Sequence, residues 1–185
     1  MTSYFKQYRP FLFFLLRFAL TYVVLAYCYG LYLEQFSVER KEVDGITQWV
    51  AEQSKSVLQL VDSEAYIVPN PKEAGVKLFF HHRWIARIVE GCNAISVMIL
   101  FVSFVIAFKG KFKAMVWFLP FGIAVIHIAN IIRIALLAVA LYHFPKAEHL
   151  LHGVLFPLLI YGIVFILWMI WVNRFSEYAK GTTQK

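Results

Sequence analysis

Long apolar runs of about 20 residues dominate the pattern of hydrophobic and polar positions along this chain. They cover about residues 11–33, 93–108, 115–142 and 154–172. Such lengths match the roughly 30 Å hydrocarbon core of a bilayer, where backbone groups must be satisfied internally, as they are in helices. The pattern therefore predicts an all-α integral membrane protein with about four transmembrane helices, forming a single membrane domain over residues 1–185.

The long segment between the first two spans, about residues 34–91, has a different pattern. Asp44 can cap a helix that begins at Gly45, and apolar residues then recur at helical spacing at Ile46, Trp49, Val50, Val57, Leu60 and Val61. We expect an amphipathic helix that lies on the membrane surface or packs over the spans, and a lid over a site is compatible with both. The later run GVKLFFHHRW fits either a short strand or an interfacial segment.

Composition and charge add a direction across the membrane. The chain is 61% hydrophobic, above the roughly 45–50% of soluble domains. Residues 34–90 hold seven basic and nine acidic residues, so the net charge of +7 belongs to the short ends and the loop 109–113. Basic residues favour the cytoplasmic side. Both termini are therefore predicted to be cytoplasmic, with residues 34–91 outside the inner membrane, and the first span retained as an anchor. The charge is a topology signal and predicts no nucleic-acid partner.

Polar residues from three spans are predicted to meet at one depth. Arg133 lies 18 residues into the third span, or about 27 Å from the inner face at 1.5 Å per residue. Asn130 is one turn earlier on the same face. Cys92 begins the second span from the outer side, and His149 and His152 begin the fourth. Polar groups at membrane depth usually face a bundle interior or cavity.

Each of these residues also has an ordinary structural explanation. Arg133 can extend its guanidinium to lipid headgroups, and Cys92 can be a small buried hydrophobe. A Cys28–Cys92 disulfide is a further alternative. The chemical alternative is acyl transfer. A thiolate, favoured by a nearby cation, is the nucleophile; histidine carries the proton; arginine stabilises the oxyanion. No metal or cofactor is expected.

Three stretches resemble the exosortase/archaeosortase family of membrane cysteine transpeptidases. They are EGCNAIS at 90–96, NIIRIALLA at 130–138 and HLLHGVLF at 149–156. The family pattern is a Cys motif preceded by Glu, a later Asn-x-x-Arg helix, and a His at the head of the next helix. With about four spans instead of eight, this chain looks like a short bacterial branch, and Asn93 stands where a glycine is common.

The resemblance implies roles for individual residues. Cys92 would be the nucleophile, Arg133 the oxyanion or thiolate stabiliser, and an outer histidine the acid–base, with Asn130 and Glu90 supporting them. His152 is favoured over His149, the alternative acid–base, because Phe156 follows it by four residues and then Tyr161. His143 ranks third.

The resemblance also implies partners. The substrates would be secreted proteins with a C-terminal tail made of a short motif, one transmembrane helix and a basic cluster. The chain would cleave the tail at the outer face and transfer the product through a thioester to an envelope acceptor, either a lipid or a glycan. The alternative function is a non-catalytic membrane scaffold or assembly subunit, in which Asn130 and Arg133 bind a partner helix. A small transporter is a weaker alternative.

Overall fold

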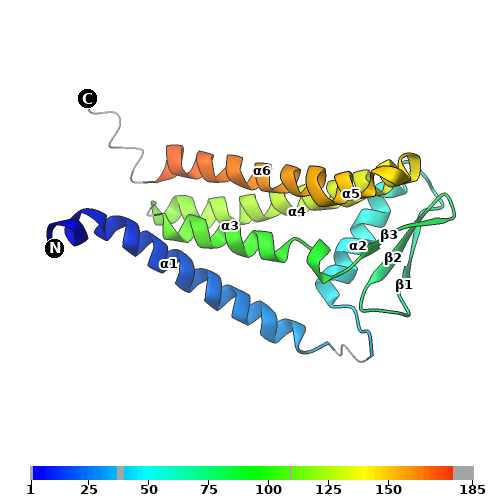
Figure 1. The fold of residues 1–185 in the computed structure, drawn as a ribbon, viewed down its shortest axis with the longest axis horizontal. Helices are drawn as coiled ribbons and strands as arrows, with labels where there is room; N and C mark the ends of the chain where they lie inside the picture. The colour runs from blue at the N-terminus through cyan, green and yellow to red at the C-terminus, as the bar shows by residue number, and fades with distance from the viewer. Residues whose placement is uncertain (1, 37–39, 109, 177–185) are drawn as a thin grey trace.

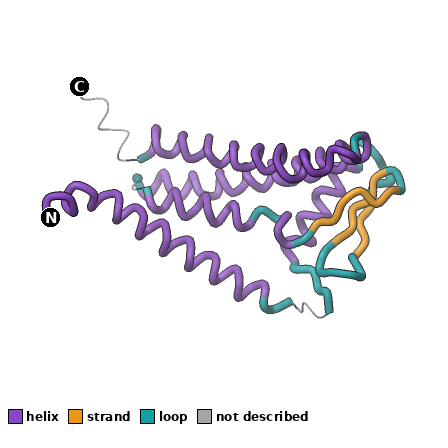
Figure 2. Tube along the Cα trace, viewed as in Figure 1, coloured by secondary structure: helices purple, strands orange, loops and turns teal. Residues whose placement is uncertain are grey.

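The computed structural model describes residues 2–36, 40–108 and 110–176, which form a helical bundle with a small cap at one end (Figures 1 and 2). The bundle contains α1 (Thr2–Leu33), α3 (Ile95–Ala107), α4 (Phe112–His143) and α6 (Phe156–Ile170). The cap contains α2 (Gly45–Leu58) and a three-stranded sheet. The start of α1 and the end of α6 lie at the bundle end away from the sheet (Figure 1).

Three helical stretches are long and apolar enough to cross a membrane. They are Tyr8–Leu33, with 26 residues, Phe112–His143, with 32, and Pro145–Phe175, with 31. The predicted second span is represented by α3, whose 13 residues rise about 20 Å and are shorter than a hydrocarbon core. The predicted all-α integral membrane fold is confirmed, with one membrane-level helix shorter than expected.

The last helical stretch changes its winding close to a proline. It runs through η2 (Pro145–Ala147), α5 (Glu148–Leu150), the π-helical turn η3 (Leu151–Leu155), α6 and a second π turn, η4 (Trp171–Phe175). Pro157 has no N–H, and its ring crowds the carbonyl four residues earlier. The turn before it is widened, with the Phe156 N–H bonded to the Leu151 carbonyl. This wide turn carries His152.

The predicted cap of α2 is confirmed, but its predicted apolar stripe is wrong in part. The Asp44 carboxylate accepts a 2.9 Å hydrogen bond from the Thr47 N–H. The buried face consists of Thr47, Val50, Ala51, Ser54 and Leu58. Trp49 is half exposed, and Leu60 and Val61 are exposed because the helix ends at Leu58. Residues of α2 contact α4 and the sheet, so this helix packs over the spans.

The undecided run GVKLFFHHRW forms a hairpin. Strands β1 (Tyr66–Pro69), β2 (Val76–Phe80) and β3 (Arg83–Ile88) pair antiparallel in that order. His81 and His82 form the turn at φ of 48° and 59°, the left-handed conformation that two-residue hairpin turns require. The Asp62 carboxylate accepts a 2.7 Å hydrogen bond from the His81 N–H and so stabilises this costly turn.

Two apolar cores meet near Cys92. The cap core joins α2 and the sheet to the half of α4 that lies nearest the sheet, and its members include Val50, Leu78, Phe80, Ile134 and Ala138. The bundle core joins α3, α4 and α6 and includes Met98, Phe101, Phe118, Val164 and Trp171. Cys92 packs against the first core, and Ala94 belongs to the second. The chain between them therefore crosses the boundary between cap and bundle.

Candidate active site

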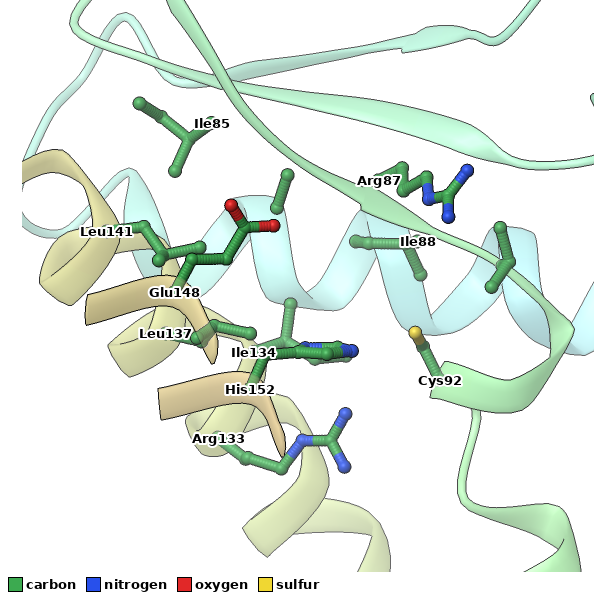
Figure 3. Close-up of a pocket in the computed structure, with 12 residues that line it drawn as sticks. Ile85, Arg87, Ile88, Cys92, Arg133, Ile134, Leu137, Leu141, Glu148 and His152 are labelled. Atoms are coloured by element: carbon green, nitrogen blue, oxygen red, sulfur yellow. The ribbon is translucent and has the colours of Figure 1, made fainter. Parts of the chain in front are cut away.

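Cys92 lies at the end of a single 3₁₀ turn, η1 (Glu90–Cys92), that connects β3 to α3. Its N–H donates to the Val89 carbonyl at 2.8 Å. Ala94 then adopts φ of 62°, and α3 begins at Ile95, whose N–H is capped by Asn93 Oδ1 at 2.9 Å. This left-handed turn redirects the chain from the sheet into the bundle. The half-buried Cys92 side chain points into a cleft beside it (Figure 3).

Asn130 holds the backbone of the cysteine. This residue of α4 is fully buried, and its Nδ2 donates a 2.7 Å hydrogen bond to the Cys92 carbonyl oxygen. Its Oδ1 is buried without a hydrogen-bond partner among the described residues. The predicted supporting residue therefore contacts Cys92 through the main chain and fixes the turn from which the thiol projects.

Arg133 and His152 reach the same cleft from two other elements. Arg133 comes from α4, one turn after Asn130, and His152 comes from the π turn η3. Figure 3 shows the imidazole and the guanidinium extending toward the side of the cleft where the Cys92 sulfur lies. The Nε of Arg133 is buried and has no partner among the described residues. The three side chains predicted to converge do line one cleft.

We call this space, of about 210 Å³, the thiol cleft. It is lined by Ile85, Ala86, Arg87, Ile88, Val89, Cys92, Arg133, Ile134, Leu137, Leu141, Glu148 and His152. Its walls are β3 on one side and α4 with the α5–η3 turn on the other. No residue of α2 appears in this lining, so α2 does not form the lid that the sequence allowed.

Glu148 is a cleft residue that the sequence analysis missed. It lies four residues before His152, and its carboxylate faces the cleft from the end away from Cys92 (Figure 3). Residues four apart share a helix face, so this spacing was an available signal. Arg87 also lines the cleft, but its guanidinium is paired with Glu73 at 2.8 Å. Arg133 is therefore the cleft arginine without a carboxylate partner among the described residues.

Glu90 supports the site from behind. The Tyr29 hydroxyl of α1 donates to Glu90 Oε1 at 2.9 Å and accepts from Asn93 Nδ2 at 2.7 Å. Asn93 Nδ2 also lies 3.2 Å from Thr47 Oγ1 of α2. These bonds connect α1 and α2 to the two residues that flank the Gly91–Cys92 step. Glu90 therefore anchors the cysteine turn and does not line the thiol cleft.

The other candidates lie outside the cleft. His143, His149 and His152 are all exposed, but His143 and His149 do not line the thiol cleft. Cys28 is exposed on α1, and both cysteines are free, so the disulfide alternative is not realised. Of the histidines considered from the sequence, His152 is the one that lines the thiol cleft with Cys92.

A family model supplies the comparison with known proteins. The model described as transmembrane exosortase matches residues 10–174, which is most of the chain. The chain belongs to the transmembrane exosortase family. Searches of curated proteins and of solved structures give no match.

The arrangement in this exosortase provides three kinds of chemistry. A thiol can form a covalent intermediate, an imidazole can move a proton, and a guanidinium can stabilise negative charge. Ile134, Leu137 and Leu141 make the helical wall largely apolar, which strengthens electrostatic interactions within it. The hydrogen bonds around Glu90, Asn93 and Asn130 hold the backbone of the cysteine turn in place.

Proposed function

We propose that this chain is a membrane-embedded cysteine transpeptidase that cleaves C-terminal sorting tails of secreted proteins. The observation that carries the proposal is the single cleft lined by Cys92, Arg133 and His152, which come from η1, α4 and η3. Membership of the exosortase family supports it. The cleft lies where the cap meets the bundle, which suits a bond located just outside a substrate's transmembrane helix.

The reaction proceeds in two halves. The Cys92 thiolate attacks the carbonyl carbon of the scissile peptide bond, and Arg133 stabilises the oxyanion that forms. The C–N bond then breaks, His152 gives a proton to the leaving amine, and the released tail remains in the membrane. The secreted part stays on Cys92 as a thioester.

The second half regenerates the enzyme. A nucleophilic group of the envelope acceptor, a lipid or a glycan, loses its proton to His152 and attacks the thioester carbonyl. The new acyl bond forms as the C–S bond breaks, and the Cys92 thiolate is restored. Acid–base assistance of this kind contributes about 10²–10⁴-fold to a rate.

The test uses a tagged secreted reporter fused to the C-terminal tail of a secreted protein from the same genome. Cys92→Ala should abolish processing while the amount of membrane-inserted enzyme stays unchanged. Cys28→Ala is the matched control, because this cysteine is exposed on α1 away from the cleft, and it should process the reporter normally.

Variants of His152 and His149 test which histidine carries the proton. His152→Ala should lose at least about 10²-fold in processing and accumulate unprocessed reporter or a hydroxylamine-sensitive adduct on Cys92. His149→Ala, three residues away and outside the cleft, should remain active. Normal processing by both Cys92→Ala and His152→Ala would refute the transpeptidase proposal and favour the scaffold.

A further inference from the structure

One edge of β3 has no strand beside it, and we call it the free edge. The sheet order is β1-β2-β3, so β3 pairs with β2 on one side, and no described residue extends the sheet on the other. An edge strand presents unpaired backbone N–H and C=O groups that can pair with another extended chain. Peptide-binding proteins use such edges to add a strand.

The thiol cleft follows this edge. Five consecutive residues, 85–89, line the cleft together with Cys92. Side chains alternate between the two faces of a strand, so a cleft that touched one face would be lined by every second residue. An unbroken run of lining residues indicates a cleft that lies along the strand's edge.

A second cleft continues the first. This outer cleft, of about 580 Å³, is lined by Trp84, Ile85, Ala86, Arg87 and Glu148 together with residues near the β1–β2 turn. It shares Ile85, Ala86, Arg87 and Glu148 with the thiol cleft. One groove therefore runs from Cys92 along the edge of β3 and opens at the sheet.

Strand β3 also has a β-bulge beside this groove. Leu78 pairs with Ala86 and Phe79 pairs with Trp84, which leaves Ile85 as an extra residue opposite the step between them. Bulges of this kind bend an edge strand and often lie beside active sites. Ile85 lines both clefts, so the bulge lies where the two clefts join.

We infer that the free edge of β3 binds the substrate residues that precede the scissile bond, as an extended strand hydrogen-bonded to the β3 backbone. The inference rests on the proposed function and deepens it by naming where the substrate binds. The five lining residues, 85–88 of β3 and the extended Val89 after it, span about 16 Å at roughly 3.3 Å each. This length holds four or five substrate residues, with the last of them at Cys92.

The direction of the bound strand follows from the fold. β3 runs from the outer end of the cap toward η1 and the bundle (Figure 1). A substrate whose transmembrane helix follows the scissile bond enters the bundle level at Cys92, and its preceding residues extend outward. The substrate strand therefore runs parallel to β3. Main-chain pairing supplies much of the affinity, and alternate side chains contact the wall formed by Leu137 and Leu141.

Photocrosslinking tests the position. A photoreactive phenylalanine replaces Trp84 on β3 or, as the matched control, Tyr66 on β1, the opposite edge of the sheet. Both are aromatic and solvent-accessible, at 57% and 39% exposure. The probe is the tagged reporter whose tail the wild-type enzyme processes, tested in a Cys92→Ala background. Trp84 should crosslink the reporter at least tenfold more strongly than Tyr66.

The substrate backbone provides a second test that leaves the enzyme unchanged. Proline is placed in turn at the five reporter positions before the scissile bond, with alanine at the same positions as the control. Proline removes one N–H, and the N–H groups of a paired strand point alternately toward and away from its neighbour. Processing should fall at least tenfold at every second position with proline and much less with alanine.

The outcomes separate the two proposals. Cys92-dependent processing with equal crosslinking from Trp84 and Tyr66, or with no two-residue period, would leave the transpeptidase function standing and overturn docking at the β3 edge. A crosslinker moved from Trp84 to Arg87, nearer Cys92, should label a reporter residue nearer the scissile bond. The opposite shift would overturn the parallel direction. If no tail is processed, the transpeptidase proposal fails, and the docking inference fails with it.

Discussion

Replacing Asn130 with leucine separates the positioning of the thiol from the stability of the fold. Asn130 is fully buried, and its amide donates to the Cys92 carbonyl at 2.7 Å. The Asn130→Leu variant keeps the branching and the number of heavy atoms of the side chain, although leucine is larger, and it removes that donor. The half-buried Cys92 carbonyl then loses its bond from α4, and an acceptor left unsatisfied costs at most about 1–3 kcal/mol.

A second term offsets this cost. Oδ1 of Asn130 is itself a buried acceptor without a partner among the described residues, and leucine removes it. Relief of that acceptor is of the same order, about 1–3 kcal/mol. The two contributions have opposite signs, so the free energy of unfolding should change by less than about 2 kcal/mol. The turn that carries the thiol, however, loses its anchor to α4.

Activity should respond far more than stability. A displacement of about 1 Å at a reacting group can cost about 10²-fold in rate, so Asn130→Leu should process the reporter about a hundredfold more slowly. Pulse–chase of the tagged reporter measures the rate, and thermal unfolding of the detergent-solubilised protein measures stability. Ser103→Ala is the matched control. This buried hydroxyl of α3 bonds to the Ile99 carbonyl at 2.7 Å, outside the thiol cleft. Wild-type processing by Asn130→Leu would refute the positioning role.

Four further outcomes are expected. Arg133→Lys should insert normally but process poorly, because lysine keeps the charge and loses the planar fork; full activity would leave Arg133 as a headgroup contact. Hydrogen bonds from the backbone of His81 and then of Glu64 hold the pKa of Asp62 below its usual range. These hydrogen bonds stabilise the fold above the ordinary carboxyl pKa of about 3.9, and this stabilisation should be lost as pH falls through the folded-state pKa of Asp62. If the melting temperatures of Asp62→Asn and of the wild type were the same between pH 6 and 3, this explanation would be contradicted. Ala94→Gly should change the free energy of unfolding by less than about 1 kcal/mol, because relief of the left-handed backbone is offset by the lost burial of the Ala94 methyl group and by the greater freedom of glycine in the unfolded chain. Ala94→Val places a β-branched residue at positive φ and should lower it by more. An impermeant maleimide should label Cys92 from the outer side of the inner membrane, and labelling that needs access from the cytoplasm would reverse the predicted topology.

The hydropathy pattern was sufficient to predict that the main cleft residues lie close together. The positions where apolar runs begin and end place Cys92, Arg133 and His152 at one depth, because helix rise converts sequence distance into height. The choice between His149 and His152 needed more than depth. It depends on the wide turn before Pro157, which sets the direction of each side chain around the helix axis, and a repeat of 3.6 residues does not describe that turn.

Other features depend on contacts between distant segments. Tyr29 meets Asn93 across 64 positions of sequence, and neither residue carries a local signal for the other. The hairpin turn uses His81 and His82 in a conformation usually taken by Asn or Gly, so its composition did not indicate a turn. The apolar stripe of α2 failed at Leu60 and Val61 because helical spacing continues in the sequence beyond Leu58, where the helix ends.

Cys92 lies between the cap core and the bundle core, so its thiol is next to both the hydrogen bonds of Asn93 and Asn130 and the free edge of β3. The bundle below Cys92 has exposed apolar residues on α4 and α6, such as Leu136 and Leu158, against which a substrate helix can pack through its side chains. The cap above it offers the polar backbone edge of β3, which suits an extended chain. A substrate that changes from extended chain to helix at its cleavage site would match both surfaces only if that change occurred beside the sulfur. Recognition would then depend on where the helix begins as much as on side-chain identity, so moving the start of the reporter's transmembrane helix by four residues should stop processing even when its motif is intact.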